Sequence, residues 1–294
     1  MQNRTFRLLT SLFALGFLAC HGFAQSSAGV IKAMRVTGTV SRVASGGTQT
    51  PLTDGTALTE TDTVVTGANS SLVLVFMNGS SVRLGANSRL LIEEFKMDPL
   101  DHDIAVAQLK NEPTHSKTSL NLSYGELVGD VKKLNKSSSY SIKTAVGAAG
   151  IRGTTFRIVF TPSADGKTYN FQLSTAEGLV VFTGTAGSMP IEVAKGKEVV
   201  VTAEVNTTTG QVTASQVQIQ GLSSESAQQI QAAVTDAIEQ AQQNAVFTPT
   251  EQTATSGGGD AAGAPSSNST PDPLGQAAPT ITQPISPTVV SPSS

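Results

Sequence analysis

Short runs of alternating apolar and polar residues fill the chain from about residue 30 to about residue 220. Alternation with a period of two is typical of half-buried β-strands, and Gly, Asn and Asp separate the runs as turn residues do. The runs are VIKAMRVTGTVSRV, SLVLVFMNGSSVRL, LNLSYGEL, SYSIKTAV, TFRIVF, YNFQLSTAEGLVVF and KEVVVTAEV. Because this spacing leaves no room for crossover helices, we predict an all-β domain over residues 30–220 rather than a parallel α/β sheet.

The sharpest turn signal in this domain is Asn78-Gly79 with Ser80 after it. Asn-Gly between two apolar runs supplies the positive φ angles of a tight type I′ turn. We therefore predict a hairpin that turns at these residues.

One helical pattern covers residues 223–245. Its apolar side chains recur at a spacing of 3.6 residues, and Ser223 or Ser224 can cap it ahead of Glu225 in the first turn. They are Ile230, Val234, Ala237, Ile238 and Ala241. We expect this face to pack on its own domain, and self-association through the helix is the alternative.

The composition changes after the helix. Residues 246–294 are rich in Ser, Thr, Pro, Gly and Ala and carry few large apolar side chains. Such a stretch buries too little apolar surface to offset the entropy lost on ordering, so we predict a disordered tail.

The N-terminus has the features of a cleavable signal peptide over residues 1–24. Arg4 and Arg7 precede an apolar run over residues 8–19, and a small residue at Ala24 suits cleavage before Gln25. The run falls short of the roughly 20 residues that span a bilayer, which argues against a transmembrane anchor. We therefore expect a periplasmic or secreted protein.

Cys20 offers a second way of processing this N-terminus. Residues 17–20 form a loose lipobox that would lipidate Cys20, but Phe17 stands where Leu is usual. We favour cleavage near Ala24 for this reason. Cys20 is the only cysteine. Cleavage near Ala24 therefore leaves the mature protein without a thiol for a disulfide, a metal site or a nucleophile.

Charge is distributed unevenly along the chain. Lys197 is the last basic residue, and six acidic residues follow Glu204 without a basic one. Nucleic-acid binding requires clustered Lys and Arg, so we exclude nucleic acid as a partner.

Several short motifs in the β domain resemble those of the FecR domain. The matching stretches are residues 61–95, residues 122–127, TAVGAAGIRGTTFRIVF at residues 144–160, AEGLVVF and VAKGKEVVV, and the Arg-Gly-Thr-x-Phe core is the most specific. The residues that carry the resemblance, in structural or partner-contact roles, are Thr66, Gly67, Asn78, Gly79, Ser80, Gly125, Arg152, Gly153, Thr154, Phe156, Glu177 and Gly178.

The resemblance implies an all-β periplasmic domain, solenoid-like or jelly-roll-like. Founding members of the family sense an outer-membrane receptor and pass its state to a cytoplasmic sigma factor. A signal peptide here replaces their cytoplasmic segment and transmembrane helix, and we see no second βαβ module. We therefore expect a stand-alone exported FecR-like protein without sigma-factor control.

Arg152 has two candidate roles. Its planar guanidinium can bracket backbone carbonyls or a carboxylate such as Glu126 or Glu177, which is the role that we favour. The other role is contact with a ligand or partner.

The chain carries no recognisable catalytic motif. Asp98, Asp101, His102 and Asp103 form an oxygen-rich cluster, but it lacks the ligand rhythm of a calcium loop and reads as a solvated insertion. No nucleophile elbow, phosphate loop or carboxylate pair is recognisable. We expect no enzyme activity, no cofactor and no metal.

The sequence thus predicts an exported, non-catalytic FecR-like binding or scaffold module of the bacterial cell envelope. It would act through contacts with an envelope protein that the sequence does not identify. The alternative is a carbohydrate- or peptidoglycan-binding domain, although a chain without Trp and with few Tyr lacks the aromatic faces on which sugars stack.

Overall fold

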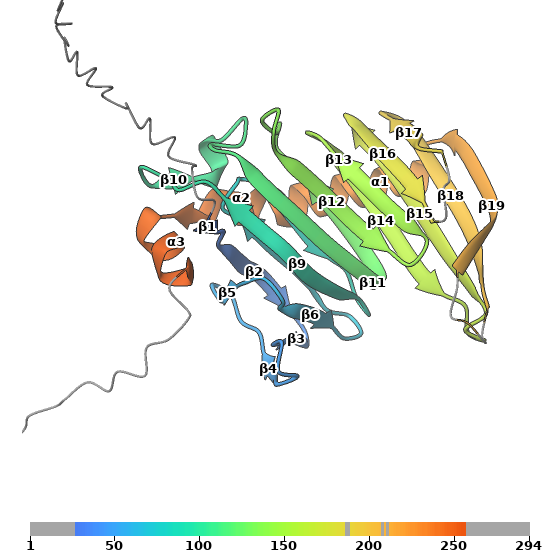
Figure 1. The fold of residues 1–294 in the computed structure, drawn as a ribbon, viewed down its shortest axis with the longest axis horizontal. Helices are drawn as coiled ribbons and strands as arrows, with labels where there is room; N and C mark the ends of the chain where they lie inside the picture. The colour runs from blue at the N-terminus through green and yellow to red at the C-terminus, as the bar shows by residue number, and fades with distance from the viewer. Residues whose placement is uncertain (1–26, 186–188, 207–208, 210–211, 257–294) are drawn as a thin grey trace, which may run out of the picture. The chain divides into compact units, whose positions relative to one another are not determined.

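The structure is a computed structural model that describes residues 27–185, 189–206, 209 and 212–256. Most of these residues lie in β-strands of one large mixed sheet, which bends into two packed layers (Figure 1). The signal peptide predicted for residues 1–24, with Cys20, lies outside the described residues.

Layer A contains, in spatial order, β4 (Gln49–Pro51), β3 (Val40–Val43), β6 (Thr63–Thr66), β9 (Arg89–Met97), the first part of β11 (Ser116–Asp130), β12 (Ser139–Thr144), β13 (Gly147–Ile151), β16 (Leu179–Gly184) and β17 (Ile191–Ala194). Short β1 (Ser27–Ala28) pairs with the end of β9.

Layer B contains β5 (Ala57–Leu58), β2 (Ile31–Thr37), β7 (Ser71–Phe76), β8 (Ser81–Leu84), the second part of β11, β14 (Thr155–Pro162), β15 (Thr168–Glu177), β18 (Lys197–Val205) and β19 (Val212–Gly221).

Strand β11 joins the two layers. Residues 116–124 pair with β9 in layer A, and residues 125–130 pair with β14 in layer B. The change falls at Gly125, whose φ of 110° is open to glycine and strained for other residues. The two layers therefore share one strand, and no pairing between their outer strands closes the sheet within the described residues.

The β-rich fold predicted for residues 30–220 is confirmed. The pairing of named strands is antiparallel except between β11 and β12, which differs from the stacked parallel coils of a solenoid. Several strands were not among the predicted runs, including β6, β9, β13, β17 and β19. Gly178, at a φ of 81°, divides the single run predicted over residues 169–182 into β15 and β16.

The core lies between the layers and is built around phenylalanines. Phe76 of layer B meets Phe95 of layer A edge-on at 5.1 Å, and Phe171 stacks on Phe182 at 4.8 Å between ring centroids. All four are at most 2% exposed. Aromatic pairs of this kind add about 0.5–1.5 kcal/mol beyond burial, so they fix the two layers against each other.

The hairpin between β7 and β8 is confirmed, but its turn is not the predicted type I′. Gly79 alone takes a positive φ, 86°, whereas Asn78 does not. The amide of Gly79 donates to Phe76 O and that of Phe76 donates to Ser80 O. This is the pattern of a longer loop with a left-handed glycine, because the Asn78 side chain already accepts from Ser80 N.

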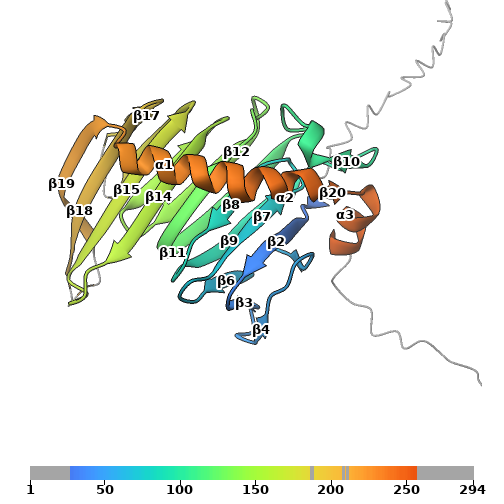
Figure 2. The ribbon, with the colours of Figure 1, turned by 180° about the vertical axis from the view of Figure 1, so that it is seen from behind.

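The predicted helix is confirmed as α1 (Ser224–Ala233), a π-helical turn η2 (Val234–Ile238) and α2 (Glu239–Asn244) in one continuous rod. Ser223 caps it by accepting from Ser226 N. Figure 2 shows the rod running along the outer face of layer B. Ile230, Ile238 and Ala241 are buried, so the apolar stripe packs on its own domain as predicted.

The segment after the helix departs from the prediction of disorder from residue 246. Val246–Phe247 forms β20, paired with β10 (Ile104–Ala105), and α3 follows at Pro249–Ser256. Gln252, buried, donates to Ser27 Oγ and Met97 O and accepts from Leu100 N. The composition did not predict this ordered segment, because the segment is held by one fully buried phenylalanine, Phe247, and by a few amide hydrogen bonds. The rest of the predicted tail lies outside the described residues.

A 3-10 turn, η1 (Val106–Gln108), completes the described elements. None of the helices in the described part of the chain combines the length and the apolar character needed to traverse a bilayer.

Candidate functional site

Two halves of the predicted motif meet where β13 leads to β14. Gly153 and Gly178 have φ angles of 63° and 81°, and a Cβ atom on Gly178 would lie 2.4 Å from Gly153 O. Thr154 Oγ1 donates to Leu179 O at 3.1 Å. The Arg-Gly-Thr piece and the Glu-Gly piece therefore lock against each other through their backbones.

The first half of the motif forms a similar contact. Thr66 Oγ1 donates to Gly85 O at 2.6 Å and accepts from Ser88 N at 2.9 Å. Gly67 N donates to Thr39 O, and a Cβ atom on Gly125 would lie 2.0 Å from Ser88 Oγ. These residues hold the turn before β9 against the point where β11 changes layer.

A chain of hydrogen bonds runs from the Asn-Gly-Ser turn to Arg152. Asn78 Nδ2 donates to Ser116 Oγ at 3.0 Å, and Ser116 Oγ donates to Glu112 Oε2 at 2.9 Å. Glu112, only 4% exposed, also accepts from Asn135 N. Asn135 O in turn accepts from Arg152 Nη2 at 3.2 Å. Motif residues about 70 positions apart are thus joined through one buried carboxylate.

Arg152 itself lies at the surface and brackets a loop. Its Nη2 donates to Lys136 O at 2.8 Å as well as to Asn135 O. This is the carbonyl-bracketing arrangement anticipated for it. The side chain also borders a shallow apolar depression with Leu179 and Val181 on the outer face of layer A.

The two carboxylates considered as partners of Arg152 have other partners. Glu126 Oε1 accepts from Arg157 Nε at 2.6 Å, and Glu177 pairs with Lys195 at the surface. Phe156, the last motif residue, is fully buried against Gly129, where a Cβ atom would lie 2.4 Å from its ring. Its contacts are those of a core residue.

The oxygen-rich segment lies in the loop between β9 and β10. Asp101 and His102 are exposed and pair with each other, and Asp98 Oδ2 lies 3.1 Å from Nδ1 of His115. Among the residues that the structure describes, no three His, Cys, Asp or Glu side chains are grouped to hold a metal ion.

Glu198 anchors the start of the helix to layer B by accepting from Oγ of the capping residue Ser223 at 3.4 Å. The carboxylate is fully buried and accepts from Gln220 Nε2, Ser174 Oγ and Gln172 Nε2 at 2.7–3.0 Å. Burial alone would raise the pKa of Glu198. The hydrogen bonds from Gln220, Ser174 and Gln172 outweigh burial and leave this pKa below its usual value.

Gln242 anchors the other end of the helix. Its Nε2 donates to Ser81 Oγ and Asp130 Oδ2, and its Oε1 accepts from Lys132 Nζ. With polar anchors at both ends, the helix is held across β14 to β7 of layer B.

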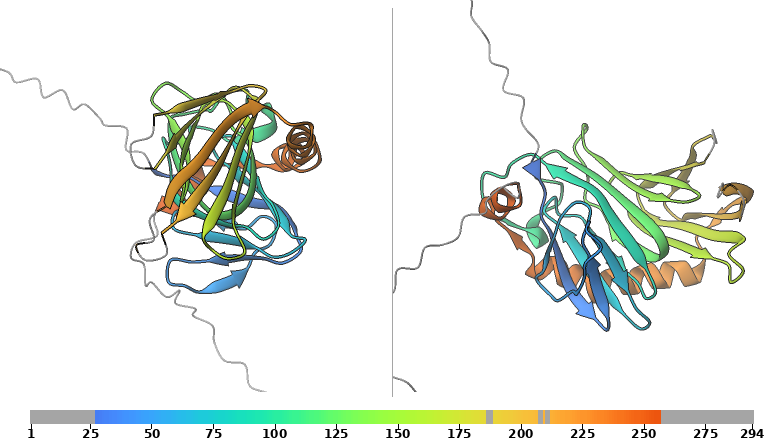
Figure 3. Two further views of the ribbon diagram at one scale, coloured as in Figure 1. Left: turned by 90° about the vertical axis from the view of Figure 1, so that its right-hand side faces the viewer. Right: turned by 60° about the horizontal axis from the view of Figure 1, so that its bottom comes forward.

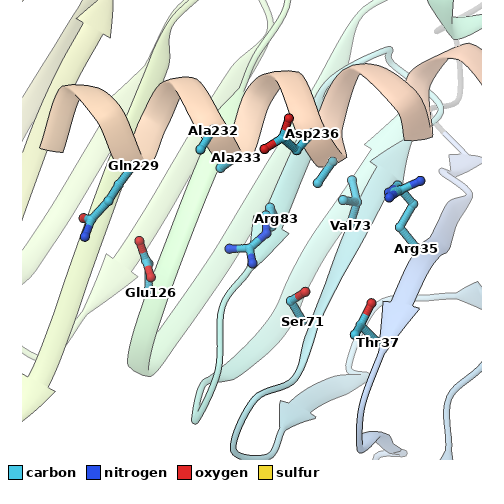
Figure 4. Close-up of a pocket in the computed structure, with 11 residues that line it drawn as sticks. Arg35, Thr37, Ser71, Val73, Arg83, Glu126, Gln229, Ala232, Ala233 and Asp236 are labelled. Carbon is cyan, nitrogen blue, oxygen red and sulfur yellow. The ribbon is translucent and has the colours of Figure 1, made fainter. Parts of the chain in front are cut away.

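Between these anchors, a groove of about 380 Å³ lies under the helix, against β2, β7 and β8. On the helix side it is lined mainly by small residues, Ala232, Ala233 and Ala237, which leave the space unfilled. Figure 4 shows Arg83 beneath the helix, with Glu126 to one side of it and Arg35 to the other.

The strands beneath the helix project the arginines into the groove. Arg83 pairs in register with Val73 and Val128, so it lies on the outward face between buried Val82 and Leu84. Arg35 stands in the irregular part of β2 at a φ of 53°, an uncommon angle for a residue with a side chain. The π-helical turn, a feature often found at functional sites, covers the groove.

The polar groups in this groove have few partners. No hydrogen bond or ion pair reaches the side chains of Arg35, Arg83, Asp236, Thr37 or Ser71 within the described ranges. Gln229 Oε1 is buried without a hydrogen bond. Sequence reasoning did not single out these residues, although Arg83 stands at an outward position of an alternating run.

The molecule is thus a two-layered β domain whose motif residues are joined by internal hydrogen bonds, with a helical strap across one layer. Residues 62–181 match the family model described as FecR protein, and the chain contains a FecR domain over these residues. The helix over residues 224–244 and the strands β18 and β19 lie outside the residues that match this family model.

Two crystal structures from Parabacteroides distasonis ATCC 8503, each described as a "putative anti-sigma factor", are similar to this chain. The first shares 10% identity and a TM-score of 0.38, covering 56% of this chain and 62% of its own. The second shares 12% identity and a TM-score of 0.38, covering 58% and 63%. The chain thus spans about three fifths of their length. No curated protein matches the sequence significantly.

Proposed function

We propose that this protein is an exported, non-catalytic binding module of the bacterial cell envelope that captures a partner protein by strand addition to β19. The observation that carries the proposal is the contrast between β19 and the other three outer strands of the sheet. Support for the module's general class comes from the FecR domain over residues 62–181.

Three outer strands carry the protections that proteins commonly give to exposed edges. β4 is three residues long and ends in Pro51, and β5 has two residues. Beyond β5, the loop at Asp54 covers β2, whose Val36 N donates to Asp54 Oδ1. β17 is four residues long and contains Glu192.

Strand β19 has none of these protections. It has ten residues without a charge or a proline, and nine of the ten are exposed. Val217 and Ile219 are 46% and 58% exposed. β19 pairs with β18 alone within the described residues, so its other edge is free to pair with a strand.

The side chains of β19 also suit a partner strand. Val217 and Ile219 pair in register with Val201 and Val199, which face the core. The two therefore lie on the inner face of the sheet. Figure 3 (left) shows β19, in orange, at the end of the two-layered domain. An added strand would form main-chain hydrogen bonds with β19 and cover this apolar pair, which is how edge recognition combines affinity with specificity.

Photo-crosslinking from the edge tests the proposal. A photoreactive residue at Gln218 should crosslink, in envelope fractions, to one extended segment of a partner protein, mapped by mass spectrometry. Val217→Lys with Ile219→Lys should abolish the crosslink, because charges on an edge strand oppose pairing. Leu179→Lys, at an apolar site on layer A that is 38% exposed, should leave it unchanged.

Other outcomes overturn the proposal. Crosslinks that link only two copies of this chain would mean that a second copy occupies the edge. Crosslinks that survive the double lysine variant would exclude strand addition. Export is tested separately, by the N-terminal mass of the mature chain in fractionated cells, which we expect to begin at Gln25. An intact N-terminus in the cytoplasm would contradict it.

A further inference from the structure

We infer that the groove under the helix is a binding site for a short acidic peptide segment. The site is separate from the β19 edge, and the inference does not depend on the proposed function. It is carried by the convergence of unpartnered polar groups on one cavity.

The cationic side of the groove is provided by layer B. Arg35 and Arg83 project from β2 and β8, and no carboxylate forms an ion pair with either among the described residues. Glu126, at the groove's edge, is neutralised by Arg157. Guanidinium groups present paired donors that match a carboxylate, so two free arginines select an anionic ligand.

The helical side supplies hydrogen-bond acceptors. Asp236 projects from the π-helical turn, and Gln229 Oε1 is buried without a partner. A buried oxygen without a hydrogen bond is uncommon and costs stability, so it points to a donor that a ligand brings. The N–H groups of a peptide backbone are such donors, whereas inorganic phosphate at neutral pH offers few.

Hydroxyl groups complete the floor of the groove. Thr37 and Ser71 are cross-strand partners on β2 and β7, and both line it without a hydrogen bond of their own within the described residues. They can donate to peptide carbonyls. With a volume of about 380 Å³ the groove can hold about two residues of an extended chain.

These groups together define the ligand. Carboxylate side chains bind Arg35 and Arg83, backbone N–H groups bind Asp236 and Gln229, and carbonyls accept from the hydroxyls. Asp236 also opposes dense negative charge, which disfavours phosphate relative to a peptide.

Titration calorimetry on the full chain tests the inference with a capped dipeptide, acetyl-Glu-Glu-amide. We expect saturable binding that weakens about tenfold or more in Arg83→Gln and in Arg35→Gln, which is the size expected for a lost charged hydrogen bond. Arg89→Gln is the matched control for Arg83→Gln, since both arginines are half-buried and unpaired among the described residues but Arg89 lies outside the groove.

A second variant removes space and leaves the charges in place. Ala232→Leu should fill the groove and weaken dipeptide binding while thermal unfolding stays close to that of the wild type. Acetyl-Gln-Gln-amide and inorganic phosphate should each bind at least about tenfold more weakly than the acidic dipeptide. The inference is overturned by absent binding, by equal binding of either probe, or by equal losses in Arg89→Gln and Arg83→Gln.

Discussion

The FecR motif turns and the helix groove use their polar residues in opposite ways. In the motif turns, four polar side chains form hydrogen bonds with backbone or side-chain groups of the domain. They are Thr66, Asn78, Arg152 and Thr154. In the groove, Arg35 and Arg83 have no such partner within the described residues. In this chain the residues that carry the FecR resemblance form internal hydrogen bonds that stabilise the fold, whereas the unpaired arginines of the groove are not among them.

The largest expected effect comes from a motif glycine. Gly178→Ala should lower the free energy of unfolding by about 3 kcal/mol or more, because it adds a backbone clash to the cost of a positive φ. Gly166→Ala is the control: its φ is also positive, 67°, but no atom lies within 4 Å of the added Cβ. It should cost about 1 kcal/mol. Urea unfolding measures both, and equal losses would mean that the motif contact is not tight.

The next effect concerns the buried carboxylate that anchors the helix. Glu198→Gln should cost about 1–3 kcal/mol at pH 7, because charged hydrogen bonds from Gln220, Ser174 and Gln172 are weakened. The folded-state pKa of Glu198 lies below its usual value, so this contribution is complete above about pH 4.3. It is lost as pH falls through the lower, folded-state pKa.

Urea titrations of the wild type and Glu198→Gln at several pH values between 7 and 2.5 measure this difference. It should stay constant above about pH 4.3 and shrink as pH falls through the folded-state pKa of Glu198. Glu239→Gln, at an exposed position of the same helix, should change stability by less than about 0.5 kcal/mol throughout. If the difference in unfolding free energy between the wild type and Glu198→Gln instead grew at low pH, the pKa of Glu198 could not be lowered in the folded state.

The smallest expected effect is in the groove and is the sharpest test of the comparison. Arg83→Gln should change the free energy of unfolding by less than about 0.5 kcal/mol, because it removes no internal partner. Arg157→Gln should cost about 1–3 kcal/mol, since it leaves Glu126 without its ion pair. Thermal and urea unfolding measure both variants. A large loss in Arg83→Gln would show that this arginine already has a structural role.

The local sequence was sufficient to predict most of the longer strands, the hairpin at Gly79 and the helix from Ser223. These elements depend on period, turn residues and capping, which operate within a few residues. The motif resemblance likewise identified the domain that the family model matches. The type I′ turn was predicted wrongly, because Asn78 uses its side chain to bind Ser80 N and Ser116 Oγ, contacts that depend partly on a strand 38 residues away.

Tertiary structure alone decided which polar side chains have no partner and where the groove forms. The neighbouring sequence does not indicate that Arg83 is unpaired or that Ala232 lines a cavity. Both depend on how the helix that contains Ala232 packs on strands about 150 residues earlier in the chain. The order of residues 246–256 depends in the same way on Phe247 and Gln252 reaching the N-terminal strands. Periodicity in the sequence determined which elements form and which face is apolar; only packing decided which polar groups were left without partners.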